Sequence, residues 1–231
     1  MKEAFQDLGL IVAAAGSSSR FGEKNKLLLT LGKMPVFCHC LKNFFEYASP
    51  QATILCVSEE NFTEFENLLK IHLPEIFEKI SLLSGGSSRS ETVLKALRSL
   101  PEPCRYVAVQ DAARPLSSAG LLLKCLESAK KYGSGVAAKR LTDTVKMANE
   151  EDFAVKTLER RLLWHTETPQ VFEKKILLQA YDKCYESEKL FVDDAQLLEE
   201  VGIPVKLVEN KELNNKITIF ADFNLISQII V

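Results

Sequence analysis

The chain has little net charge of either sign and no long apolar run. Its 29 Lys and Arg residues nearly balance 31 Asp and Glu residues, which leaves a formal net charge of −2. Without a global basic field, nucleic acid and anionic membrane surfaces are poor partners. No apolar run approaches the length that a helix needs to cross a bilayer, so we expect no membrane partner. Any binding of anions must therefore be local.

Cysteine pairs of the CxxC kind are missing as well. The six cysteines fall mostly inside apolar segments, which indicates reduced core residues. The triplet Cys38-His39-Cys40 does contain metal-binding residue types. If residues 35–48 form a helix, however, Cys38 and Cys40 point to nearly opposite sides and cannot bind one ion. We therefore interpret this triplet as part of the core and not as a zinc site.

The first apolar run superficially resembles a secretory leader, because LIVAAAG ends in small residues. The residues ahead of it carry Glu3 and Asp7 against a lone Lys2, which is the wrong charge for the start of a signal peptide. We therefore expect a cytoplasmic protein.

Short apolar segments alternate with segments of helical spacing over the first half of the chain. Strands are predicted at residues 8–15, 52–58, 79–83 and 106–110, and helices at residues 35–48, 62–72, 88–100 and 119–132. This alternation predicts an α/β fold with a doubly wound, mostly parallel sheet of the Rossmann-like kind. At 231 residues we expect a single domain, residues 1–231.

The pattern changes from Gly135 onward. After a strand at 136–138, residues 144–147 and 155–158 read as two short strands around a polar turn. This β-hairpin has little sequence nearby to pack against, so we expect a projecting arm at about residues 141–162. Beyond it we predict helices at 174–184, 193–201 (with Asp193 as N-cap) and 222–230, and strands at 204–208 and 216–219.

The first predicted strand runs directly into a small, polar loop, GSSSRFGEKNK at residues 16–26. Small residues let backbone N–H groups approach an anion, and Arg20 and Lys26 add positive charge. The loop has neither the Gly-Lys-Ser/Thr ending of a Walker loop nor the three spaced glycines of a dinucleotide fingerprint. We interpret it as a phosphate-binding loop of another kind; a solvated basic turn is the alternative.

Two more polar stretches follow predicted strands, GGSSR at 85–89 and DAAR at 111–114, and a third, NNK at 214–216, places a lysine at the start of a short predicted strand. Because the strand ends of a parallel sheet lie along one edge, these groups can meet in one crevice. A carboxylate among several cations is the composition of a magnesium–triphosphate site, with Asp111 binding Mg²⁺ or another divalent cation. Taken alone, Asp111 could equally be a helix cap or part of a loop salt bridge.

Six motifs now occur in order along nearly the whole chain: AAAG at 13–16 with Arg20 and Lys26, GG at 85–86 with Arg89, DAARP at 111–115, DTVK at 143–146, LWH and TPQ within 163–170, and NKIT at 215–218. This set resembles that of the 2-C-methyl-D-erythritol 4-phosphate cytidylyltransferases of the non-mevalonate isoprenoid pathway. The resemblance implies a nucleotidyltransferase fold and transfer of CMP from CTP to methylerythritol phosphate, with release of pyrophosphate.

The resemblance also implies roles for individual residues. It assigns catalysis to Arg20, Lys26 and Lys216, and nucleotide binding to Ala14, Ala15, Gly16, Gly86, Ser87, Thr92 and Ala112. It assigns substrate binding to Arg114, Thr144, Arg160 and Thr168, and the metal to Asp111. The chain departs from the family pattern at two positions, because Asn25 stands where proline is usual and Ser87 where many members have an acidic residue.

The implied reaction needs no Ser/His/Asp or Cys/His set, because a phosphate monoester is already an anionic nucleophile. Catalysis would consist of positioning and of charge neutralisation by Arg20, Lys26, Lys216 and Mg²⁺. We interpret His165 as a packing or structural hydrogen-bonding residue. We interpret Trp164 as a packing residue too.

Thr144 and Arg160 lie on or beside the predicted arm, yet the resemblance assigns them to the substrate site. Both hold if the arm packs against a second subunit, so we expect a homodimer with shared sites. Three alternatives stay open at this point: a cytidylyltransferase for another polyol phosphate such as ribitol 5-phosphate, a nicotinamide-dependent dehydrogenase, and a non-catalytic nucleotide sensor.

Overall fold

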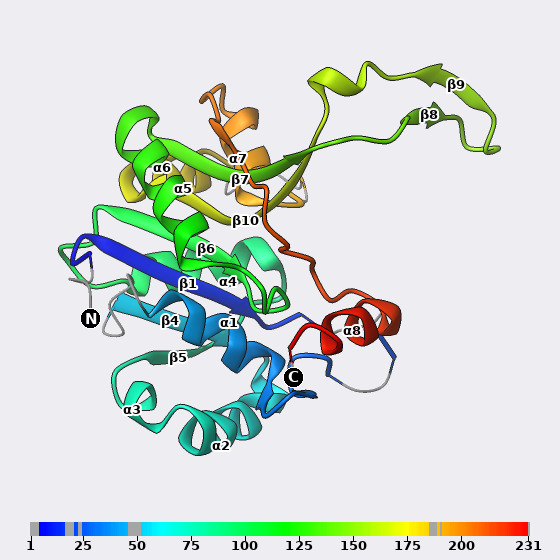
Figure 1. The fold of residues 1–231 in the computed structure, drawn as a ribbon. Helices are drawn as coiled ribbons and strands as arrows, with labels where there is room; N and C mark the ends of the chain where they lie inside the picture. Colours follow the sequence, from blue (N-terminus) through cyan, green and yellow to red (C-terminus); the bar gives the residue numbers. More distant parts are fainter. Residues whose placement is uncertain are drawn as a thin grey trace.

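The computed structural model describes residues 5–16, 21–22, 25–45, 52–184, 189 and 191–230. The strands of its central sheet are β1 (Leu8–Ala14), β4 (Thr53–Val57), β5 (Ser81–Ser84), β6 (Tyr106–Asp111), β7 (Ser134–Arg140), β10 (Trp164–Glu173) and β11 (Leu207–Glu209). They form a seven-stranded sheet in the order β11-β7-β10-β6-β1-β4-β5 (Figure 1). Two short pairs lie outside it, β2 (Thr30–Leu31) with β3 (Met34–Pro35) and β8 (Lys146–Ala148) with β9 (Ala154–Thr157).

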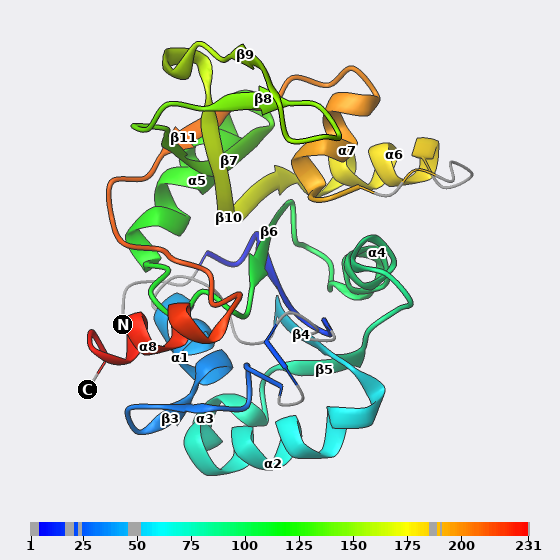
Figure 2. The same ribbon diagram turned by 90° about the vertical axis from the view of Figure 1, so that its right-hand side faces the viewer.

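Helices cover both faces of the sheet, which gives three layers. One core contains side chains of α1 (Val36–Phe44), α2 (Phe62–His72), α5 (Ala119–Tyr132) and α8 (Phe220–Ser227). The other contains side chains of α4 (Arg89–Ser99), α6 (Lys174–Cys184) and α7 (Asp194–Glu200). Figure 2 shows α1, α5 and α8 on one side of the sheet and α4, α6 and α7 on the other. The short helix α3 (Pro74–Phe77) follows α2. Within the described ranges, no helix combines the length and hydrophobicity that crossing a bilayer requires.

The central strand β1 shows why the sequence forms this sheet. It pairs in parallel with β4 on one side and with β6 on the other. Successive side chains of a strand point to opposite faces, so Leu10 and Val12 belong to one core and Ile11 to the other. A strand that is buried on both faces has to be apolar throughout, as β1 is. The predicted doubly wound α/β fold is confirmed.

Strand β10 was not predicted. After the half-buried Trp164 it has two exposed residues, His165 and Thr166. It also contains Pro169 and shifts register between Thr166 and Gln170, so it lacks the apolar run of a buried strand. It runs antiparallel to both neighbours, β6 and β7. The connection from β7 to β10 therefore leaves and returns at the edge of the sheet where β1 and β6 end. The β8–β9 hairpin projects from that edge as an arm (Figure 1).

The strand predicted at residues 216–219 is wrong, because this segment has no regular secondary structure. Its backbone is held against the loop that follows β6 by the amide of Ile217, which donates to the carbonyl of Ala113 at 2.9 Å. A single backbone hydrogen bond does not make the series of bonds that defines a β-strand. The side chain of Ile217 is nevertheless fully buried, which explains the strand-like pattern. The arm, the N-cap role of Asp193 and the bounds of α2, α5 and α6 agree with the prediction.

Candidate active site

A cavity of about 420 Å³ lies at the carboxyl ends of β1 and β6. The chain builds the sheet outward from β1 in one direction through β4 and β5, and in the other through β6, so the cavity lies at the point where the winding reverses. Its lining combines small residues with three cations and one carboxylate: Ala13, Ala15, Gly16, Lys26, Leu27, Gly86, Ser87, Ser88, Arg89, Thr92, Asp111, Ala113 and Lys216.

The loop after β1 presents Lys26 to this cavity. The Asn25 side chain accepts a hydrogen bond from the amide of Leu27 at 3.1 Å, and the Asn25 carbonyl accepts from the amide of Leu28 at 3.1 Å. Asparagine stabilises such a turn through its own side chain, so it supports Lys26 where a proline would have done so through its ring. Arg20, the other cation predicted in this loop, lies outside the described residues.

The loop after β5 forms the opposite wall. Gly85 is required by close approach, because a Cβ there would collide with the side chain of Ala15. The amide of Gly86 donates to Thr92 Oγ1 at 2.9 Å, and the amide and hydroxyl of Ser87 both donate to Glu91 Oε2 at 2.7 Å. These bonds from Ser87 lower the pKa of Glu91 to about 2. The loop is thus tied back to the first turn of α4.

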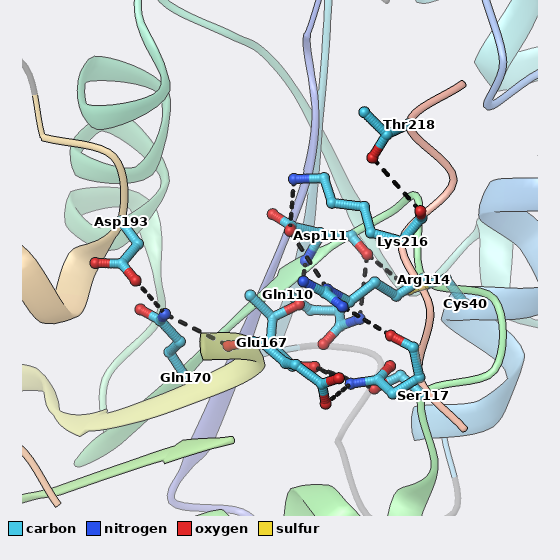
Figure 3. A network of polar contacts seen from close by, with 12 residues as sticks. Cys40, Gln110, Asp111, Arg114, Ser117, Glu167, Gln170, Asp193, Lys216 and Thr218 are labelled. Atoms are coloured by element: carbon cyan, nitrogen blue, oxygen red, sulfur yellow. Dashed lines mark hydrogen bonds and ion pairs between the residues drawn. The ribbon is translucent and has the colours of Figure 1, made fainter. Parts of the chain in front are cut away.

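Asp111, the last residue of β6, lies between Lys216 and Arg114 (Figure 3). Lys216 Nζ lies 2.8 Å and Arg114 Nε 3.6 Å from Asp111 Oδ2. The side chain of Asp111 is only 13% exposed, and burial raises its pKa. Lys216, Arg89 and Arg114 together outweigh this effect and lower the pKa to about 2, so the carboxylate is ionised. Thr168 Oγ1 accepts a hydrogen bond from the amide of Asp111 at 3.0 Å.

Arg89 has no role in the sequence-based assignment, although its motif was noted. It follows the N-cap Ser88 at the start of α4 and lines the cavity. Its guanidinium forms a 2.8 Å ion pair with the fully buried carboxylate of Asp194, which also accepts a 2.6 Å hydrogen bond from the hydroxyl of Tyr181. Asp194 lies 105 positions further along the chain, and no local pattern could indicate this pairing.

The predicted site residues other than Arg20, which lies outside the described residues, fall into three groups. Eight of them line the cavity: Ala15, Gly16, Lys26, Gly86, Ser87, Thr92, Asp111 and Lys216. Four lie buried next to the lining: Ala14, Ala112, Arg114 and Thr168. Thr144 and Arg160 are exposed in the arm segment, where Arg160 Nη1 donates to the carbonyl of Thr142 at 2.8 Å.

The residues present fit a hard divalent cation. Asp111 is ionised and lines the cavity, and Mg²⁺ typically binds one or two carboxylates together with substrate phosphates and water. A site made of protein alone is a different matter, because no group of three or more His, Cys, Asp or Glu suited to a metal occurs in the described part of the chain. At the Cys38-His39-Cys40 triplet, His39 Nε2 lies 2.6 Å from the carbonyl oxygen of Leu31.

Comparisons with known proteins give a consistent result. A model of the 2-C-methyl-D-erythritol 4-phosphate cytidylyltransferase family matches residues 8–231. The protein of that name from Caldanaerobacter subterraneus is 34% identical over 216 residues, which is 92% of this chain and 93% of the relative. The one from Dehalococcoides mccartyi is 36% identical over 213 residues, with 92% and 91% covered.

Solved structures agree with the sequence matches. The cytidylyltransferase from Francisella tularensis superposes with a TM-score of 0.76 at 28% identity, covering 95% of this chain and 98% of the other. The enzyme from Thermus thermophilus gives a TM-score of 0.79 at 25% identity, with 97% and 98% covered. The family match includes every strand of the sheet and every part of the cavity.

Proposed function

The chain belongs to the 2-C-methyl-D-erythritol 4-phosphate cytidylyltransferase family, and we propose that the cavity beside Asp111 is where it transfers CMP from CTP to methylerythritol phosphate and releases pyrophosphate. The observation that carries this assignment is the contact of the Asp111 carboxylate with Lys216, 2.8 Å away, in a cavity that Lys26 and Arg89 also line. Both substrates are phosphate anions, and the cations that line this cavity can bind such anions.

The two loops that face each other across the cavity are suited to CTP. We assign the triphosphate to the loop after β1, with Ala14, Ala15, Gly16, Arg20 and Lys26, because backbone amides and cations bind phosphate oxygens. We assign the cytidine to Gly86, Ser87 and Thr92, with Ala112 near the ribose. The hydrogen bonds of Ser87 to Glu91 hold this wall of the cavity in one conformation, which supports its assignment as a binding surface.

Asp111, with oxygens of the bound phosphates, would hold Mg²⁺, which supplies charge neutralisation where the triphosphate binds. Lys216 then has to turn from Asp111 toward the α-phosphate. Its side chain is 39% exposed, so this movement needs no displacement of the core. Once both substrates are present, the Asp111 carboxylate can therefore bind the metal cation, and the Lys216 ammonium can bind the phosphate.

The reaction itself is an in-line displacement at the α-phosphorus. A phosphate oxygen of methylerythritol phosphate attacks, and pyrophosphate leaves. Two anions have to approach each other, so Arg20, Lys26 and Lys216 contribute by neutralising charge and by holding the reacting groups in line. No proton has to be removed from the nucleophile, so no general base is needed.

The acceptor side involves the arm. We propose that Thr144 and Arg160 bind methylerythritol phosphate and that Arg114 and Thr168 support them from below. We also propose that residues 1–231 form one domain and that residues 141–162 form a dimerisation arm. The arm carries exposed apolar side chains, Met147, Phe153 and Val155 among them, which supports a second copy of the chain as its partner.

The test is a panel of substrates. The protein is incubated with Mg²⁺, one of the four nucleoside triphosphates and either methylerythritol phosphate or ribitol 5-phosphate, and pyrophosphate is measured. We expect release with CTP and methylerythritol phosphate. Faster release with ribitol 5-phosphate would contradict the proposed acceptor, and faster release with another triphosphate would contradict the proposed donor.

Asp111→Asn tests the role of the carboxylate. We expect the variant to fold and to lose most of its activity at millimolar Mg²⁺, because the neutral amide is a poor ligand for a hard cation. Asp182→Asn removes an exposed carboxylate that pairs with Arg98 at 3.1 Å and serves as the control. Near wild-type turnover by Asp111→Asn would exclude Asp111 as the metal ligand.

A further inference from the structure

Lys216 lies on a segment without regular secondary structure, yet its ammonium lies at a defined place in the cavity. We propose that Glu167, a buried carboxylate outside the cavity lining, is a positioning residue that holds Lys216 in place through Asn214. The inference rests on the proposed function, since it concerns how one of the proposed catalytic cations is held. Nothing in the resemblance or in the assigned reaction gives Glu167 a role.

Glu167 is 4% exposed, and it is surrounded by donors. Its Oε2 accepts hydrogen bonds from Asn210 Nδ2 at 2.7 Å and from Asn214 Nδ2 at 3.0 Å. Its Oε1 lies 3.8 Å from Lys139 Nζ. An ionised carboxylate only accepts, so both asparagines must turn their amide nitrogens toward it. Glu167 thereby fixes the orientation of both side chains.

Asn214 transmits this constraint to the cavity. It is 1% exposed, and its Nδ2 donates to the carbonyl of Thr168 at 2.8 Å in addition to Glu167. The backbone carbonyl of Asn214 accepts from Arg114 Nη1 at 2.7 Å. Two residues later, Lys216 Nζ reaches Asp111. The segment is therefore held at Asn214 in two ways, by Glu167 through the side chain of Asn214 and by Arg114 through its carbonyl.

Two neighbouring residues of β10, Glu167 and Thr168, support the Asp111–Lys216 pair from its two sides. Thr168 accepts the hydrogen bond from the Asp111 amide, and its neighbour Glu167 accepts the one from Asn214. Lys216 has to turn its side chain from Asp111 to the phosphate, and this movement stays small only if the backbone is already fixed, since reorganising the backbone as well would cost free energy. Glu167 contributes by fixing the backbone from which Lys216 extends, and it does not touch substrate itself.

Glu167→Ala removes the acceptor of both asparagines. We expect kcat to fall by about 10- to 100-fold, in the range that a small misplacement of a catalytic group can cause, while KM for CTP stays within about twofold. Glu167→Gln keeps one oxygen acceptor and should retain most of kcat. Ser134→Ala is the matched control, because it removes a buried hydroxyl that accepts from the amide of Lys206 at 2.9 Å, at the far end of β7.

A double-mutant cycle separates positioning from a general loss of stability. If Glu167 acts through Lys216, adding Glu167→Ala to Lys216→Ala lowers kcat no further. A merely structural role would multiply the two losses. If Glu167→Ala does not fold, Asn214→Leu breaks the same link from the other side and should show the same lack of additivity with Lys216→Ala.

The inference is overturned by multiplied losses, by an unchanged kcat in Glu167→Ala, or by an equal loss of kcat in Ser134→Ala. It is also overturned if Lys216→Ala leaves kcat unchanged, since there is then no cation to position. A wild-type protein without activity in the substrate panel would instead refute the proposed function, which distinguishes the two failures.

Discussion

Asp111 has more positive charge around it than one carboxylate can neutralise. Lys216, Arg89 and Arg114 all lower its pKa, and only the first two line the cavity. Asp194 pairs with Arg89, so Asp111 and Asp194 together offset two of these three charges, and the remaining positive charge is available to substrate phosphates. The carboxylate itself contributes to stability, because it offsets repulsion among these cations.

This contribution predicts a pH dependence of stability. The pKa of Asp111 is lowered from 3.8 to about 2, so the unfolded chain takes up this proton at a higher pH than the folded one. The stabilisation is therefore fully present above pH 4 and is lost as the pH falls toward 2. We expect metal-free wild type to exceed Asp111→Asn by about 2 kcal/mol in free energy of unfolding at pH 6.

Urea unfolding of both proteins between pH 2 and pH 6, with a chelator present, measures this difference. Asp182→Asn, which replaces an exposed carboxylate, should show no comparable trend. An advantage of the wild type that stays constant down to pH 2 would contradict the lowered pKa of Asp111.

Lys26 and Lys216 are predicted to act in the transition state. Lys26→Ala and Lys216→Ala should each lower kcat by about 10²- to 10³-fold, as is typical when one preorganised charge-stabilising group is removed. Steady-state kinetics with both substrates varied gives the measurement, and Lys124→Ala on the surface of α5 gives a control. Changes confined to KM in both variants would limit these lysines to substrate binding.

Much of the candidate site could be predicted from the sequence, because most of it follows strand ends. Lys26, Gly86 and Asp111 each come shortly after a readable apolar run, and the parallel sheet brings them to one edge. Glu167 and Asp194 could not be found in this way. Their partners lie far away along the chain, and neither residue has a local pattern that differs from an ordinary surface acid.

At the scale of elements, the most informative link joins α4 to α6 and α7. Arg89 in the first turn of α4 pairs with Asp194 in the first turn of α7, and Tyr181 of α6 donates to the same carboxylate. Burial and the neighbouring Asp194 raise the pKa of Tyr181 well above its usual range, so its hydroxyl keeps the proton it donates. The loop after β5, which leads into α4, is thereby attached to α6 and α7.

Asp194→Asn tests this link. The substitution leaves Arg89 without its countercharge, and we expect a loss of about 3 kcal/mol in free energy of unfolding, as for other buried pairs with one partner removed. KM for CTP should rise, because residues 85–89 then lose their anchor. Glu200→Gln on the same helix removes an exposed partner of Lys189 and should change stability by less than about 0.5 kcal/mol.

Chemical denaturation and initial-rate kinetics check both parts of the Asp194 prediction. A variant as stable as wild type, with the same KM for CTP, would show that α4 holds the loop without help from α7.

The elements themselves were predictable where burial is one-sided or complete. The helices α2, α5 and α6 pack one face on the sheet, so their apolar spacing marks their bounds. Strand β10 has a mixed environment, exposed near Trp164 and buried near Phe172, and it therefore gives no single pattern. For residues 216–219 the error was the opposite, because a strand was predicted where only Ile217 is fully buried.

At the scale of the whole molecule, the arm is the part that the fold of one chain leaves unexplained. All residues of β8 and β9 are exposed, and the two strands pair only with each other. A two-stranded hairpin of this size is marginal in water. A second copy that covers Met147, Phe153 and Val155 would stabilise it and would bring Arg160 to another cavity.

Mixing two inactive variants tests the shared site. In a dimer with shared sites, one Lys26→Ala subunit and one Arg160→Ala subunit form one doubly damaged site and one intact site. If subunits reassort at random, half of the dimers are mixed, so activity should recover to roughly a quarter of wild type. Each variant alone, treated in the same way, serves as the control.

Native mass spectrometry establishes that subunits have exchanged. With exchange demonstrated, a mixture as inactive as its components would mean that each site is built within one chain, and the shared-site proposal would be withdrawn.

The direct pairing of β7 with β10 has a consequence for how the family can diversify. The two strands are neighbours in the sheet whatever lies between them, so the excursion from residue 141 to residue 163 can be lengthened, shortened or exchanged without altering the strand order. The loops to which we assign the cytidine lie outside this segment and would be inherited unchanged. Under the proposed assignment, a change of sequence in this one segment can therefore select a new acceptor. Grafting the segment between relatives is a direct route to engineered polyol phosphate specificity.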